Sequence, residues 1–119
     1  MAKRSVVIRM RDILKAIDEA AEILAGMDFG KYTQSVVTRR AVERCVEIVS
    51  EASRHIPGDI QAQHPEIPWA EIRAIGNRLR HNYQEVDDHI VWRVAHASLA
   101  ELKPVIGALI MAAEKDPPS

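Results

Sequence analysis

Two long segments of this sequence carry apolar side chains at the spacing of an α-helix, and they constrain the fold more than any other feature. One runs from about Ser5 to Ala25 and is followed by Gly26; the other runs from about Thr33 to His55 and is followed by Pro57 and Gly58. Apolar residues three or four positions apart form one face of a helix, and glycine or proline just beyond them marks its end. With about 20 residues each, the two helices would be about 30 Å long, which suits a helical bundle.

The middle of the chain predicts a loop and a third helix. Prolines and a glycine punctuate residues 57–68, where we expect a loop with a short helical turn around Asp59 to Gln63. Pro68 suits the first turn of a helix because its missing N–H would be unpaired there. Apolar residues then recur at helical spacing, so the third helix is expected from Trp69 to about Arg80.

The last part of the chain predicts two more helices. Asp87 and Asp88 are placed to cap a short helix that reaches about Ala97. Ser98 and Glu101 have the spacing of a capping box, which predicts that the final helix begins there. The expected fold is therefore an all-α, up-down bundle of four to five helices, with residues 1–115 as a single domain and residues 116–119 as a frayed tail.

Composition excludes several classes of protein. The 16 basic and 17 acidic side chains give a formal charge of -1, so binding to nucleic acid would need a local basic patch. Cys45 is the only cysteine, so no internal disulfide can form, and the absence of a signal peptide or membrane span from the sequence predicts a cytoplasmic protein that does not bind membranes. Metal-binding bundles place Glu-x-x-His pairs on facing helices, and the sequence contains none, so neither a metal nor a cofactor is expected.

The required basic patch lies on the predicted third helix. At 100° per residue, Arg73, Asn77, Arg80 and His81 fall on one side, and the apolar residues of the helix fall on the other. A charged outer face is also what any amphipathic surface helix shows. The residue types favour a sharper interpretation, because histidine can transfer protons near neutral pH and arginine donates hydrogen bonds to phosphate oxygens. Together they could cleave RNA without a metal, with His81 taking the proton of a ribose 2′-OH.

The same helix carries a family resemblance. The segment Ile-Gly-Asn-Arg-Leu-Arg-His-Asn-Tyr-Gln-Glu-Val, residues 75–86, resembles the signature of HepT-like proteins of the HEPN superfamily, in which an Arg-Asn pair is followed by three residues, His, one residue and Tyr. Residues 41–52, including Glu51-Ala52, look like the family's second-helix segment, and Pro68-Trp69 precedes the signature as in relatives. Val91-Trp92 and residues 99–102 are similar to its closing helices.

The resemblance implies a metal-independent endoribonuclease built as a helical bundle and active as a homodimer, whose cleft joins two copies of the motif. HepT-like proteins are toxins paired with a minimal nucleotidyltransferase antitoxin, which transfers AMP to the motif tyrosine. Carried over to this chain, His81 is the catalytic histidine, Asn77 is the motif asparagine and Tyr83 is the modification site.

One position departs from the family pattern. The family's catalytic arginine would precede Asn77, where this chain has Gly76. Arg73 and Arg80 are the two candidates to replace it. Two interpretations of Gly76 are open: it permits a close approach of helices, or it marks a chain that has lost activity and only binds RNA or a nucleotidyltransferase partner.

Overall fold

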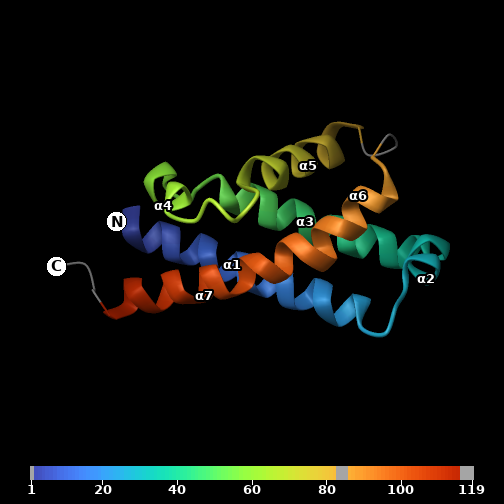
Figure 1. Ribbon diagram of the computed structural model, residues 1–119, viewed down its shortest axis with the longest axis horizontal. Coiled ribbons are helices and arrows are strands. Elements are labelled where there is room, and N and C mark those ends of the chain that lie inside the picture. The colour runs from blue at the N-terminus through green and yellow to red at the C-terminus, as the bar shows by residue number, and fades with distance from the viewer. Residues whose placement is uncertain (1, 83–85, 116–119) are drawn as a thin grey trace.

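The fold is a bundle of helices, and the described residues contain no strand (Figure 1). The computed structural model describes residues 2–82 and 86–115. In chain order the helices are α1 (Ala2–Leu24), α2 (Phe29–Gln34), α3 (Val36–Ser53), α4 (Gly58–Ala62), α5 (Trp69–Asn82), α6 (Asp88–Arg93), the π-helical turn η2 (Val94–Ser98) and α7 (Leu99–Lys115). The predicted all-α class is confirmed.

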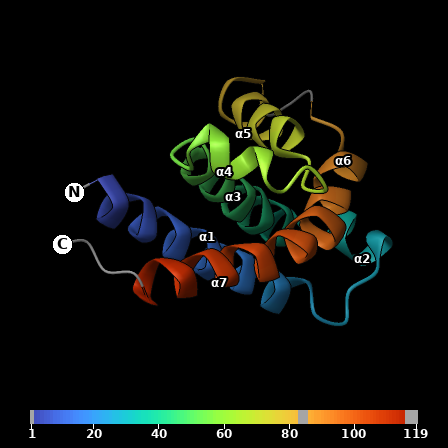
Figure 2. The same ribbon diagram turned by 60° about the vertical axis from the view of Figure 1, so that its left-hand side comes forward.

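The long helices alternate in direction, as expected of an up-down bundle. Helix α1 packs against α3 on one side and α7 on the other, and α3 also packs against α5. Figures 1 and 2 show that the beginning of α1 and the end of α7 lie at the same end of the molecule, with α2 and α6 at the other end. The molecule is elongated, with extents of 51 × 28 × 23 Å.

One contiguous core joins the four long helices. Its largest fully buried side chains are aliphatic apart from one tyrosine, and they are Tyr32, Ile13, Ile72, Ile75, Leu99, Leu102, Ile106, Val42, Val46, Val49, Val91 and Val94. Cys45 is also buried, on the apolar face of α3 where the sequence places it. Burial raises the pKa of its thiol, and the Glu19 carboxylate acts in the same direction.

The second predicted helix is divided, which corrects the expected range of Thr33 to His55. Helix α2 ends at Gln34 and α3 begins at Val36, because Ser35 has an extended backbone (φ -111°, ψ 107°). The hydroxyl of Ser35 accepts a hydrogen bond from the Thr38 N–H at 3.1 Å, which satisfies one of the unpaired donors of the α3 N-terminus.

The last two predicted helices form a single continuous helix, so the prediction of a capping box at Ser98 and Glu101 is wrong. Residues 88–115 form a continuous helix of 28 residues that passes through the π-helical turn η2. Ser98 is buried inside this helix, whereas an N-cap residue needs an extended backbone. The short pattern Ser-x-x-Glu therefore occurs here without its structural context.

That continuous helix is also long and apolar enough to cross a membrane by length and composition, and it is the one such helix among residues 2–82 and 86–115. This differs from the expectation that no segment approaches a membrane span. About 33% of its most apolar window is buried in the bundle, where Leu102 and Ile106 pack in the core, so core packing accounts for part of its apolar character.

The predicted loop between the second and third helices is confirmed, with α4 as its helical turn. Trp69 anchors the end of this loop: its ring is buried, and its indole N–H donates to the carbonyl of His64 at 3.0 Å. Helix α5 therefore starts from a fixed point on the bundle and extends along α3.

Candidate functional site

Helix α5 places Asn77, Arg80 and His81 on its outer side. Ile72, Ile75 and Leu79 are buried against the bundle, and Asn77 and His81 are exposed on the opposite side. The predicted division of this helix into an apolar and a polar face is confirmed.

Arg80 reaches from α5 back to α3. One of its terminal nitrogens lies 3.1 Å from a carboxylate oxygen of Glu51, and the other donates to the Asn77 side-chain oxygen at 3.4 Å. Its side chain is 32% exposed, so the guanidinium is held in place and still accessible to a ligand. The structure thus brings Arg80 and Asn77 together.

Arg73 is directed elsewhere. It is half-buried, and its guanidinium donates to the Gln61 side-chain oxygen at 2.8 Å; the Gln61 amide in turn donates to the carbonyls of Ser53 and Ile56. Arg73 and His81 are eight positions apart along α5, about 12 Å of helix. Arg73 therefore fixes α5 to α4, and the structure does not bring it to His81.

His81 lies in the last turn of α5, one turn beyond Asn77 on the same side of the helix. His81 is exposed, and within the described part of the chain its imidazole makes no hydrogen bond or ion pair. The predicted modification site, Tyr83, lies outside the described residues.

Gly76 is required by packing, which supports the close-approach interpretation. A Cβ atom at this position would lie 2.0 Å from the Ser50 hydroxyl oxygen and 2.2 Å from the Ser50 Cβ. Ser50 is itself fully buried, and its hydroxyl donates to the carbonyl of Arg73 at 3.2 Å. The position that holds arginine in the family motif is therefore an interior contact between α3 and α5, and no side chain fits there while Ser50 is present.

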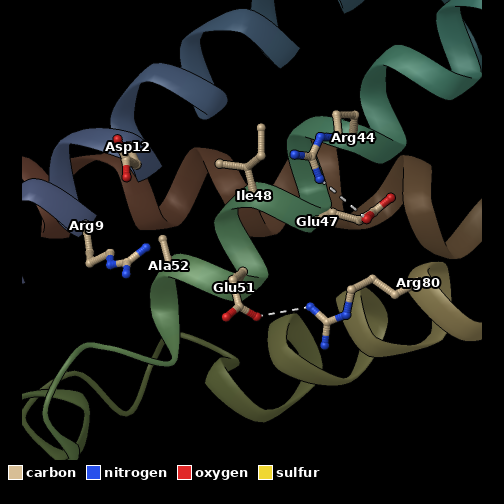
Figure 3. Close-up of a pocket in the computed structure, with 8 residues that line it drawn as sticks. All are labelled: Arg9, Asp12, Arg44, Glu47, Ile48, Glu51, Ala52 and Arg80. Atoms are coloured by element: carbon tan, nitrogen blue, oxygen red, sulfur yellow. Dashed lines mark hydrogen bonds and ion pairs between the residues drawn. The ribbon is translucent and has the colours of Figure 1, made fainter.

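A cleft that the sequence did not predict lies beside the site. It is lined by residues of α1, α3 and α5, has a volume of about 410 Å³, and is called here the arginine cleft (Figure 3). Its lining residues are Arg9, Asp12, Arg44, Glu47, Ile48, Glu51, Ala52 and Arg80. All of them except Arg9 and Asp12 belong to segments that the family resemblance or the polar face had marked. The cleft itself was not predicted, because it depends on how three helices cross.

A second polar feature lies at the α2–α6 end of the molecule. Tyr32 is fully buried, and its hydroxyl forms no hydrogen bond with the described residues. Burial raises the pKa of Tyr32 far above its ordinary value, and the nearby charges of Glu43 and Asp88 act in the same direction. Trp92 packs beside it, with ring centroids 5.3 Å apart, so this tyrosine is part of an aromatic core.

The described residues do not indicate a metal site. Across residues 2–82 and 86–115, no three His, Cys, Asp or Glu side chains are grouped as metal ligands would be. The expectation that the site works without a metal stays a prediction.

Comparison with known proteins assigns the chain to a family. Residues 13–109, from α1 to α7, match the model of the ribonuclease HepT-like family. A probable ribonuclease HepT from Thermococcus cleftensis is 36% identical over 101 residues, which cover 85% of this chain and 92% of that protein. A candidate RNase of Methanocaldococcus jannaschii is 33% identical over 103 residues, 87% of this chain and 89% of its own length. No solved structure matches the chain significantly. The match spans every long helix and the segment that carries Asn77 and His81, so the chain belongs to the ribonuclease HepT-like family.

Proposed function

We propose that this chain is a metal-independent endoribonuclease that acts in the cytoplasm as the toxin of a toxin–antitoxin pair. The observation that carries the proposal is the outer face of α5, where an exposed histidine, His81, follows an amide and a fixed guanidinium in a chain of the ribonuclease HepT-like family. The names of the relatives point to RNA as the substrate.

In the proposed reaction, the imidazole of His81 removes the proton of a ribose 2′-OH. The 2′ oxygen attacks the adjacent phosphorus, and the bond from phosphorus to the 5′ oxygen breaks. A proton returned to the 5′ oxygen completes the step, which leaves a 2′,3′-cyclic phosphate and a free 5′-OH. Arg80 stabilises the charge that develops on the phosphoryl oxygens, and Asn77 orients the arginine through their 3.4 Å contact.

Arg80 is the better candidate than Arg73 for the phosphate contact. Arg80 is adjacent to His81 in the chain and accessible, whereas the guanidinium of Arg73 is occupied by Gln61 about two helical turns away. Arg80 would thus take the role that arginine at position 76 has in the family motif.

The regulatory partner in this proposal is a minimal nucleotidyltransferase. It would neutralise the toxin by transferring AMP to the hydroxyl of Tyr83, with pyrophosphate leaving from ATP. Tyr83 is two residues beyond His81 in the sequence, so the modification would fall within the same motif as the proposed base.

The test is RNA cleavage in the presence of EDTA. We expect the wild-type protein to cut RNA but not the same strand made with 2′-deoxyribose, and His81→Ala to lower the rate by about 10²- to 10⁴-fold. His89→Ala is the matched control, because His89 is an exposed histidine on α6, and its rate should equal that of wild type. Cleavage by both wild type and His81→Ala, or by neither, would show that His81 is not the catalytic base.

The second candidate function is a non-catalytic member of the family that binds RNA or the nucleotidyltransferase. The contact between Gly76 and Ser50 favours it, because that contact excludes an arginine from the motif position. Under this alternative, the wild-type protein binds RNA or the nucleotidyltransferase, and it leaves RNA uncut in the cleavage assay.

A further inference from the structure

The arginine cleft adjoins the proposed catalytic face through one shared residue. Arg80 follows the outer face of α5 next to His81, and its guanidinium also forms one wall of the cleft (Figure 3). A ligand that contacts Arg80 from the outer face of α5 would therefore continue into the cleft.

Three guanidinium groups from three different helices line the cleft. Arg44 is loosely held, since its side chain is 70% exposed and its ion pair with Glu47 is 3.7 Å long. Arg9 is half-buried and forms no ion pair or hydrogen bond with other described residues. Guanidinium groups with spare N–H donors are suited to bind the oxygens of a phosphate group.

The three acidic residues of the cleft do not favour a cation instead. In the described part of the chain, Asp12, Glu47 and Glu51 do not form a group with metal-ligand geometry. Glu47 and Glu51 are partly exposed and lie beside arginines, and solvent-exposed ion pairs of this kind contribute little to stability. A phosphate group can therefore replace these carboxylates as the partner of the arginines.

We propose that the arginine cleft binds a backbone phosphate of the RNA strand, next to the phosphate that is cleaved. Arg9 and Arg44 hold this second phosphate, and Arg80 stands between it and His81. The inference rests on the proposed function, because it takes RNA as the ligand, and it adds a binding site from α1 and α3 that the motif on α5 does not contain.

A neighbouring cavity extends the path along α3. It has a volume of about 400 Å³, shares Arg44 and Glu47 with the arginine cleft, and reaches Arg40, Glu43 and Leu79. Arg40 and Arg44 are one helical turn apart, about 6 Å along the axis of α3. The strand would thus leave the cleft along a row of arginines on α3.

The experiment measures RNA binding apart from cleavage. Every protein carries His81→Ala, and the affinity for a fluorescent single-stranded RNA is measured by anisotropy over a range of salt concentrations. Arg9→Gln and Arg44→Gln should each weaken binding about tenfold and lower the slope of log K against log salt by about 0.7. Glu47→Gln should tighten binding about threefold, because it removes a competing carboxylate from Arg44.

Arg11→Gln is the matched control, because Arg11 is an exposed arginine on the same helix as Arg9 and pairs with Glu114 of α7, away from the cleft. It should leave both the affinity and the slope unchanged. If wild type cleaves RNA while Arg9→Gln and Arg44→Gln bind it like the control, the phosphate site is wrong and the proposed function stands. Cleavage by wild type without measurable binding by the His81→Ala protein would also overturn the site.

Two further outcomes separate the inference from the function. If the protein neither binds nor cuts RNA, both proposals fail. A glutamate-rich peptide tests the other kind of ligand. If Arg9→Gln and Arg44→Gln weaken the binding of this peptide but not the binding of RNA, the cleft binds an acidic protein partner, and the assignment to RNA is wrong.

Discussion

Tyr32 shows how one side chain can limit the stability of the bundle. Its ring fills the core near α6, but its hydroxyl is buried without a hydrogen bond to the described residues. An unsatisfied buried hydroxyl costs free energy because it has lost its bonds to water. The ring and the hydroxyl of this residue therefore act on stability in opposite directions.

We expect Tyr32→Phe to raise the free energy of unfolding by about 1 kcal/mol, because it removes the buried hydroxyl and keeps the ring. The pH dependence should change as well. The pKa of Tyr32 is raised in the folded protein, so its contribution is fully present below the ordinary tyrosine pKa of about 10 and is lost as pH rises above that value. Urea unfolding at neutral pH and above pH 10 would measure both effects. A variant that is less stable than wild type at neutral pH would show that the hydroxyl has a partner.

At the scale of elements, the contact between α3 and α5 determines what the motif can contain. Ser50 and Gly76 are complementary in size, and the hydroxyl of Ser50 also bonds to the backbone of α5 at Arg73. An arginine at position 76 thus cannot be added alone to complete the family motif. Gly76→Arg by itself would test packing and not catalysis.

We expect Gly76→Ala to destabilise the protein by about 1–3 kcal/mol, because the added methyl group overlaps Ser50. In the double variant Ser50→Gly/Gly76→Ala the nearest remaining atom is the Cα of residue 50, at 3.7 Å, which is an ordinary contact. Chemical denaturation of both single variants and the double variant forms a double-mutant cycle. Additive losses would contradict the steric explanation, and a rescue would make Ser50→Gly the background in which to place Gly76→Arg.

The sequence predicted the elements better than their contacts. Helical periodicity located the long helices, and Gly26, which has a φ of +76°, ended the first of them. The break at Ser35 was missed because no glycine or proline accompanies it. The polar face of α5 followed from its own sequence, whereas the pair Arg80–Glu51 joins residues 29 apart and depends on how α5 crosses α3. Local sequence patterns do not predict how two helices cross, so this pair could not be predicted from them.

At the scale of the whole molecule, the proposed active site is open. His81 projects from α5 into solvent, and it does not line the arginine cleft. Catalysis of phosphodiester cleavage needs one group to take a proton and another to return it, and opposed copies of α5 would supply two histidines. A homodimer across this face would complete the site.

We expect the protein to sediment as a dimer at micromolar concentration, with a symmetric interface that includes the outer face of α5. Asn77→Arg should weaken such a dimer, because a symmetric interface across the outer face of α5 would bring an added positive charge from each copy into the same contact. Lys15→Arg, on an exposed part of α1, is the control and should leave the dimer intact. A wild-type monomer that still cleaves RNA would show that one copy of the motif is sufficient.

The adjacent ends of α1 and α7 have a mechanical consequence. These two helices are antiparallel neighbours, and the beginning of α1 lies at the same end of the molecule as the end of α7 (Figure 1). Arg11 of α1 forms an ion pair with Glu114 of α7. A force that pulls the two ends apart would therefore act in the unzipping geometry. It would separate α1 from α7 one helical turn at a time, whereas a shear geometry would load the whole contact at once. The bundle should resist such pulling weakly, whatever its stability at equilibrium.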